Sequence, residues 1–204
     1  MSMNDTINGV DIATWHRTVC QVTDWLYISG DLPHRLDEGR KNLTEWFEAG
    51  ITDIVDVRGE WSDEAFVGEE RPSMRYHYFG THDDGTHQNF NWFENGIEAL
   101  VAARQNTGAK LMVHCHMGIN RGPSMALAMM LFEGWDVVDA LTAIREARPI
   151  AGIIYATDAI RAIGEMQGRT DEDIDNDITR AYGWFDQNEI SISGIIRRLR
   201  EVGE

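Results

Sequence analysis

The fold is decided by one stretch of the sequence, Val113-His114-Cys115-His116-Met117-Gly118-Ile119-Asn120-Arg121-Gly122-Pro123-Ser124. It follows an apolar run at 110–113 and precedes a segment at 124–132 with the periodicity of a helix. A strand, a tight loop and a helix N-terminus in this order leave unpaired backbone N–H groups facing the loop, at the positive end of the helix dipole. The stretch therefore predicts an anion-binding loop between a strand and a helix.

Two side chains in this loop have the reactivity that such a site can use. Cys115 stands at the start of the loop, where the donors that bind an anion also stabilise a thiolate. Arg121 stands at its end, and a guanidinium carries a fixed fork of donors that matches phosphate oxygens. A nucleophile, an oxyanion cradle and a guanidinium together indicate transfer of a phosphoryl group to sulfur.

The rest of the chain alternates between strand and helix patterns. We expect strands at 24–30, 51–57, 74–79 and 110–113, helices at 36–49, 90–105, 124–132, 136–147, 155–166 and 190–202, and a charged loop at 58–71. This alternation predicts an α/β fold with a mostly parallel central sheet flanked by helices on both faces. Ligands of such sheets bind beyond the carboxyl ends of the strands, which is where Cys115 falls.

Length and composition narrow the class of protein. The 204 residues suffice for one sizeable domain, and the net charge of −16 argues against broad contact with nucleic acid or an anionic membrane. No apolar run approaches the roughly 20 residues that span a bilayer, and the amino-terminal residues lack a signal-peptide pattern. Only Cys20 and Cys115 are cysteines, which favours a reduced, cytoplasmic setting.

With these motifs in place, the chain resembles the cysteine-dependent protein tyrosine phosphatase superfamily, in particular its dual-specificity branch. The matching segments are 25–30, 50–58 and 113–115 with Gly118 and Arg121, followed by Arg145, Arg148 and Pro149. The resemblance covers roughly residues 20–165. It implies a lead-in at 1–19, a dual-specificity phosphatase-like catalytic domain at 20–167, and an acidic segment with a terminal helix at 168–204.

The resemblance implies a mechanism without metal or other cofactor. The Cys115 thiolate would attack phosphorus in phosphotyrosine, and also in phosphoserine or phosphothreonine, of a phosphorylated protein. The oxygens would be held by Arg121 and by backbone N–H groups of the loop, which contains His116, Met117, Gly118, Ile119 and Asn120. His114 would support the loop by hydrogen bonding.

The family also implies a carboxylic acid on an upstream loop, about thirty residues before the cysteine. The polar segment 80–89 offers Asp83 and Asp84, which lie 32 and 31 residues before Cys115. Such an acid protonates the leaving oxygen and then activates water. We expect Asp83 in this role, with Asp84 as the alternative.

Two positions depart from the family pattern and keep other functions open. Gly122 stands where the family commonly has Ser or Thr, a loss that would slow hydrolysis of the phosphoenzyme or leave a phosphate-binding module with little turnover. Ser124 lies two residues further on, where it would cap the helix or reach toward the loop. Asn120 before Arg121 is similar to the RNA 5′-triphosphatase subgroup, although the acidic chain counts against an RNA substrate.

Overall fold

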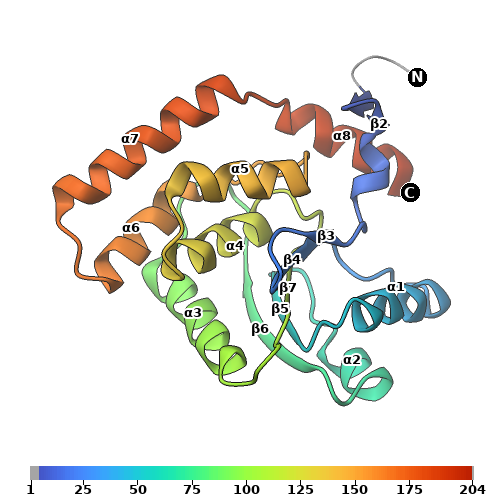
Figure 1. The fold of residues 1–204 in the computed structure, drawn as a ribbon. Coiled ribbons are helices and arrows are strands. Elements are labelled where there is room, and N and C mark those ends of the chain that lie inside the picture. Colours follow the sequence, from blue (N-terminus) through green and yellow to red (C-terminus); the bar gives the residue numbers. More distant parts are fainter. Residues whose placement is uncertain (1–4, 204) are drawn as a thin grey trace.

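The computed structural model describes residues 5–203, and its centre is a five-stranded sheet in the order β3-β4-β7-β5-β6 (Figure 1). The strands span Cys20–Gln21 (β3), Leu26–Ser29 (β4), Asp53–Arg58 (β5), Arg75–Thr81 (β6) and Leu111–His114 (β7). Neighbours from β4 to β6 run parallel, and only the short edge strand β3 is antiparallel. The expected mostly parallel sheet is confirmed.

Helices cover both faces of this sheet. One face carries α1 (Leu36–Glu48) and α2 (Glu64–Glu70), and the other carries α3 (Phe90–Arg104), α4 (Arg121–Phe132), α5 (Val137–Ala147) and α6 (Ala156–Met166). Successive strand residues point to opposite faces, so Leu26 and Ile28 pack with the α3–α6 side while Tyr27 packs with the α1–α2 side. The continuous apolar strands of the sequence follow from this double burial.

Helix α2 corrects the prediction of a loop over 58–71. Only Val67 is fully buried within its seven residues, so the sequence offers too few apolar positions to show a helical period. The helix depends instead on long-range contacts. Val67 joins the core under the sheet, and the buried Arg58 binds both Asp56 and Asp63, the residue just before α2.

The carboxy-terminal segment is helical and continues the core. The acidic segment forms α7 (Asp171–Gln187), which Thr170 caps by accepting from the backbone N–H of Asp173. Ile174 and Trp184 of α7 belong to the same apolar cluster as α4 and α6. Among the described residues, no helix combines the length and hydropathy needed to cross a membrane.

The first and last described segments lie side by side (Figure 1). The amino-terminal part forms a hairpin of β1 (Thr6–Ile7) and β2 (Val10–Asp11) and a 3₁₀ turn, η2 (Ile12–Trp15). Helix α8 (Ile192–Gly203), expected over 190–202, packs Ile195 and Leu199 into a cluster with Ile12. The guanidinium of Arg198 binds the carboxylate of Asp11 at 3.1 and 2.6 Å.

Candidate active site

The loop from Cys115 to Asn120 joins β7 to α4 at the carboxyl end of the sheet. Helix α4 begins at Arg121, three residues earlier than the apolar period suggests, and every residue from Arg121 to Leu131 is buried. The helix start therefore lies against the loop. Cys115 itself is only 1% exposed. This is the strand, loop and helix arrangement that the sequence predicts.

Arg148 fastens the loop from behind. Its fully buried guanidinium donates to the carbonyl oxygens of Gly118 at 2.6 Å and Met117 at 3.0 Å. It also donates to the carbonyl of His16 at 3.0 Å, which ties the loop to the amino-terminal segment. Gly118 has a φ of +64°, and a Cβ there would lie 2.4 Å from the Arg148 guanidinium. The loop conformation is thus fixed by packing that leaves no room for a larger residue.

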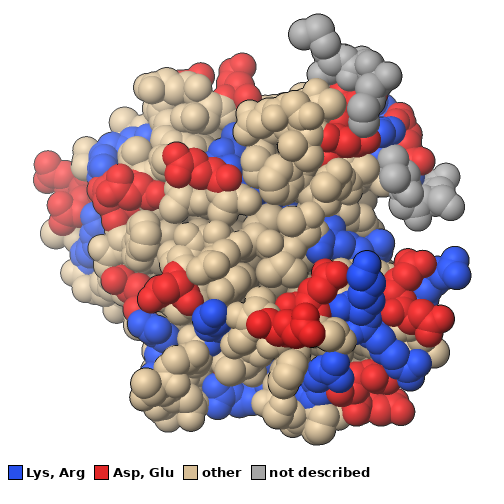
Figure 2. Space-filling model, turned by 45° about the vertical axis from the view of Figure 1, so that its right-hand side comes forward, with Lys and Arg blue, Asp and Glu red and all other residues tan. Residues whose placement is uncertain are grey.

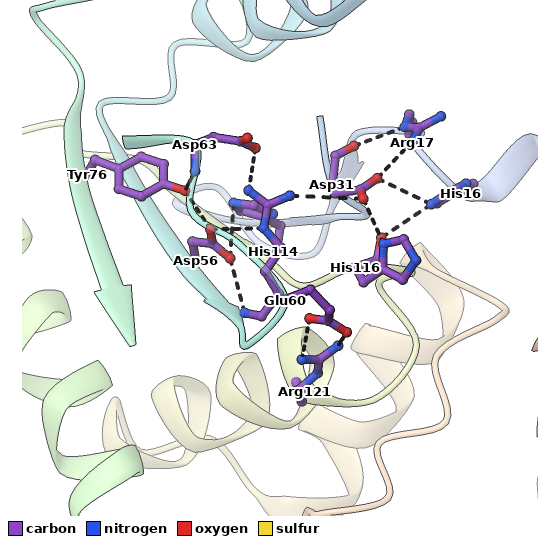
Figure 3. A network of polar contacts seen from close by, with 11 residues as sticks. His16, Arg17, Asp31, Asp56, Glu60, Asp63, Tyr76, His114, His116 and Arg121 are labelled. Carbon is purple, nitrogen blue, oxygen red and sulfur yellow. Dashed lines mark hydrogen bonds and ion pairs between the residues drawn. The ribbon is translucent and has the colours of Figure 1, made fainter. Parts of the chain in front are cut away.

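Arg121 is held by a carboxylate that the sequence analysis missed. Glu60 accepts from Nη1 at 2.9 Å and from Nη2 at 2.8 Å (Figure 3). The Thr81 carbonyl also accepts from Nη1, at 2.7 Å. Burial lowers the pKa of Arg121, but the Glu60 hydrogen bonds and the charge of Cys115 outweigh this and raise it. Glu60 follows the carboxyl end of β5, and this position is the sequence signal that could have pointed to it.

Asp83 and Asp84 occupy different environments. The Asp83 carboxylate accepts from the Tyr155 hydroxyl at 2.7 Å and from Asn120 Nδ2 at 3.4 Å, and lies 3.6 Å from Arg121 Nε. Asp84 instead accepts from the backbone N–H and hydroxyl of Thr86, at 3.0 and 2.8 Å. Burial and the hydrogen bond to Asp83 raise the pKa of Tyr155 to about 12, so Tyr155 remains a donor at neutral pH.

His116 is oriented by a buried aspartate. Its Nδ1 lies 2.7 Å from Asp31, whose carboxylate also binds Arg17 at 3.1 Å and His16 at 3.4 Å (Figure 3). Burial raises the pKa of Asp31, but the hydrogen bonds to both histidines and the charge of Arg17 more than offset it, so the net pKa is lowered. The ligand atoms of His16, Asp31 and His116 lie within 4.8 Å of one another. Arg17 already neutralises this carboxylate and would repel a metal cation there.

His114 and Ser124 differ from the expectations. His114 is fully buried beside the Trp46 ring, and neither ring nitrogen has a hydrogen-bond partner within residues 5–203. Burial lowers its pKa, which favours a neutral ring that supports the loop by packing. The Ser124 hydroxyl accepts from the backbone N–H of Tyr155 at 3.3 Å, so it links α4 to the start of α6 and neither caps the helix nor reaches the loop.

A cleft of about 380 Å³ gathers most of the predicted residues. Its lining comprises Cys115, His116, Met117, Ile119, Asn120, Arg121, Asp83 and Asp84, together with Glu60, Gly85, Ile154 and, from α8, Ile192, Ile196 and Arg200. Gly118, His114 and Ser124 lie behind this surface. The sequence predicted the loop and the acidic pair, whereas Glu60 and the α8 residues reach the cleft only through the tertiary fold.

Comparison with known proteins is consistent with this geometry. A sequence model described as dual specificity phosphatase, catalytic domain, matches residues 40–159. Dual specificity protein phosphatase 26 from Rattus norvegicus and from Homo sapiens are each 26% identical to this chain over 113 residues. The match covers 53% of this chain and 52% of each relative, so the chain spans about half the length of the curated relatives it matches.

Solved structures share the fold. The crystal structure of PTPMT1 aligns with a TM-score of 0.58 at 17% identity, over 74% of this chain and 97% of that one. A mouse putative dual specificity phosphatase complexed with zinc tungstate aligns with a TM-score of 0.60 at 19% identity, over 80% and 94%. The family match covers more than half of the sequence and includes the loop, the polar segment 80–89 and the strands β5, β6 and β7. The chain belongs to the family of dual specificity phosphatase catalytic domains.

Proposed function

We propose that this protein hydrolyses phosphate monoesters of proteins, phosphotyrosine first, through a cysteinyl-phosphate intermediate. The observation that carries the proposal is the convergence of Cys115, Arg121 and Asp83 on one cleft at the N-terminus of α4. These groups come from separate elements, and the fold brings together a nucleophile, an oxyanion-binding side chain and a carboxyl group.

The first step transfers the phosphoryl group to sulfur. The Cys115 thiolate forms an S–P bond while the bond between phosphorus and the leaving oxygen breaks, and Asp83 gives its proton to that oxygen. Backbone N–H groups of residues 116–121 and Arg121 hold the remaining oxygens. Arg121 Nε is buried with no hydrogen-bond partner in the described part of the chain, and a phosphate oxygen would satisfy it.

The second step releases phosphate. Water attacks phosphorus, the S–P bond breaks and returns the thiolate, and Asp83 takes the proton from the water. Asp83 suits this role better than Asp84, because its oxygens lie between Tyr155, Asn120 and Arg121 while Asp84 is bound to Thr86. At Gly122 no hydroxyl is available to help the thiolate leave.

An RNA 5′-triphosphate is a weaker candidate substrate. Asn120, the residue that suggested it, donates to Asp83 and so already has a role in positioning the carboxylate. Figure 2 shows acidic and basic side chains interspersed on the visible face, without the broad basic area that a polyanion would need. Both cysteines are unpaired thiols, which supports the cytoplasmic location that we propose with this function.

The test is steady-state hydrolysis of p-nitrophenyl phosphate and a phosphotyrosine peptide with EDTA present. Wild type should turn over both, and Cys115→Ser should lose turnover while still binding phosphate. Cys20→Ser is the matched control, because serine keeps a hydrogen-bonding atom at the second buried thiol, and it should stay active. Equal activity in wild type and Cys115→Ser would exclude the covalent mechanism. A wild type that binds the peptide without turnover would identify a binding module.

A further inference from the structure

We propose that Arg200 and the isoleucines beside it form a subsite for phosphotyrosine peptides that carry an acidic side chain next to the phosphorylated residue. This inference rests on the proposed function and names a preferred substrate class for the same cleft. It starts from α8, a helix beyond the segment that matches the family. Ile192, Ile196 and Arg200 of this helix line the same cleft as Cys115.

Helix α8 is fixed where it forms a wall of the cleft. Ile195 and Leu199, on its inner side, are 2% and 3% exposed and pack with Ile12, Ile119 and Ile150. Ile119 belongs to the loop that holds Cys115, so the helix and the catalytic loop share one apolar cluster. The bidentate ion pair of Arg198 with Asp11 anchors the outer turn. A wall held by buried contacts can place a charged group reproducibly beside the reaction centre.

Arg200 is the arginine of the cleft lining whose guanidinium is available to bind a ligand. Its neighbours Arg197 and Arg198 pair with Glu201 and Asp11, and Arg121 pairs with Glu60. No hydrogen bond or ion pair engages Arg200 among the side chains that the structure describes. The remaining charged groups of the lining, Glu60, Asp83 and Asp84, are acidic and lie on segments away from α8.

The composition of the wall favours a peptide. Ile154, Ile192 and Ile196 offer an apolar surface suited to the ring of a phosphotyrosine leaving group. A carboxylate beside that residue would be attracted by Arg200 and repelled by Asp84, because Glu60 is paired with Arg121 and Asp83 carries a proton before the first step. The charge pattern therefore favours a peptide whose carboxylate lies at α8. A chain of net charge −16 gains specificity from one such contact without a general attraction for polyanions.

The test measures binding of two phosphotyrosine peptides that differ only in Glu or Gln beside the phosphotyrosine. Calorimetry on Cys115→Ser should show about three- to tenfold tighter binding of the Glu peptide, as expected for a charge-assisted contact near the surface. In Cys115→Ser/Arg200→Gln this ratio should fall to about one. In Cys115→Ser/Arg197→Gln, which removes a charge from the same helix outside the cleft lining, the ratio should persist. Added salt should reduce it.

An unchanged ratio after Arg200→Gln, or equal binding of both peptides to Cys115→Ser, would overturn the subsite. A loss of binding to 5′-triphosphate RNA in Arg200→Gln, with the peptide ratio intact, would also overturn the peptide assignment. Turnover of p-nitrophenyl phosphate by the intact protein is measured separately. A preference for the Glu peptide without turnover would refute the proposed catalysis but support the subsite. Turnover without this preference would support the catalysis but refute the subsite.

Discussion

Asp83 and Asp84 show how much the contacts of neighbouring residues can differ. The two carboxylates are adjacent in a polar loop, and both line the cleft, yet only Asp83 contacts Tyr155, Asn120 and Arg121. Spacing in the sequence could not separate them, because it measures distance along the chain and not side-chain direction. The hydrogen bonds of the folded loop make the distinction.

Asp83→Asn should lower kcat by about 10²–10⁴-fold for phenyl phosphate, because this poor leaving group needs a proton. The loss should be smaller for p-nitrophenyl phosphate, whose leaving oxygen is already stabilised. The dependence of kcat on the leaving group is measured with a series of aryl phosphates, for Asp83→Asn and Asp84→Asn. Asp84→Asn is the control and should show no such trend. If only Asp84→Asn shows it, the acid is Asp84.

Glu60 orients the Arg121 guanidinium, which we propose binds the phosphate, so Glu60→Gln should lower kcat/KM. A neutral amide accepts through one oxygen and cannot hold both nitrogens of the fork, and we expect a loss of about tenfold. Equilibrium binding of vanadate should weaken in parallel. The exposed Glu64→Gln, four residues later on α2, serves as control. Tighter vanadate binding in Glu60→Gln would show instead that Glu60 competes with the ligand.

At the scale of the element, two buried side chains hold the loop from Cys115 to Asn120 in place through hydrogen bonds. Arg148 binds its carbonyl oxygens, and Asp31 orients His116 next to Cys115. Arg148 and Asp31 are at most 1% exposed and come from segments far from the loop in the sequence. The element is therefore rigid through long-range contacts, and its stability reports on them.

The contribution of the Asp31 carboxylate to the free energy of unfolding should depend on pH. Its carboxylate has a lowered pKa in the folded protein, so its stabilising effect is complete above the unfolded value of about 4 and is lost as the pH falls below it. The guanidinium groups of Arg17 and Arg58 and the titratable rings of His16 and His116 face it. Asp31→Asn should therefore destabilise the protein most near neutral pH, and the difference from wild type should shrink between about pH 5 and 3. Urea unfolding across this range measures it, and a constant difference would contradict the assignment.

Strands and helices could be predicted from the sequence where a single local pattern of apolar residues defines them. The apolar runs of the parallel strands and the amphipathic periods of six helices are local signals, and these elements are confirmed. Helix α7 was expected only as part of an acidic segment. Helix α2, with one buried residue, and the two-residue β3 are held by tertiary contacts and were missed. The same division applies to the site: the Cys115–Arg121 pattern is local, whereas Glu60, Asp31 and Tyr155 reach the loop only through the fold. The catalytic roles themselves stay predictions.

At the scale of the whole molecule, the amino-terminal 3₁₀ turn and the carboxy-terminal helix α8 pack together beside the cleft. The family match ends at residue 159, but the core continues into α7 and α8, and the amino-terminal 3₁₀ turn lies against α8. The catalytic loop contributes Ile119 to that last cluster. The terminal segments are thus part of the folded unit that supports the site.

Leu199→Ala tests this integration. Leu199 is 3% exposed, and removing a buried leucine side chain should lower the free energy of unfolding by about 2–4 kcal/mol. Tyr182→Ala on α7, where the side chain is 58% exposed, should change it by less than about 0.5 kcal/mol. Chemical denaturation measures both. Equal, small effects would mean that α8 contributes nothing to the stability of the domain.

The covalent role of Cys115 is the central claim, and trapping the intermediate tests it most directly. Rapid denaturation of wild type at alkaline pH during turnover of p-nitrophenyl phosphate, followed by peptide mass spectrometry, should find one phosphoryl group on the peptide that contains Cys115. The absence of a hydroxyl at position 122 should slow breakdown and raise the trapped fraction. Turnover with no phosphate on Cys115, together with an active Cys115→Ser protein, would contradict the account.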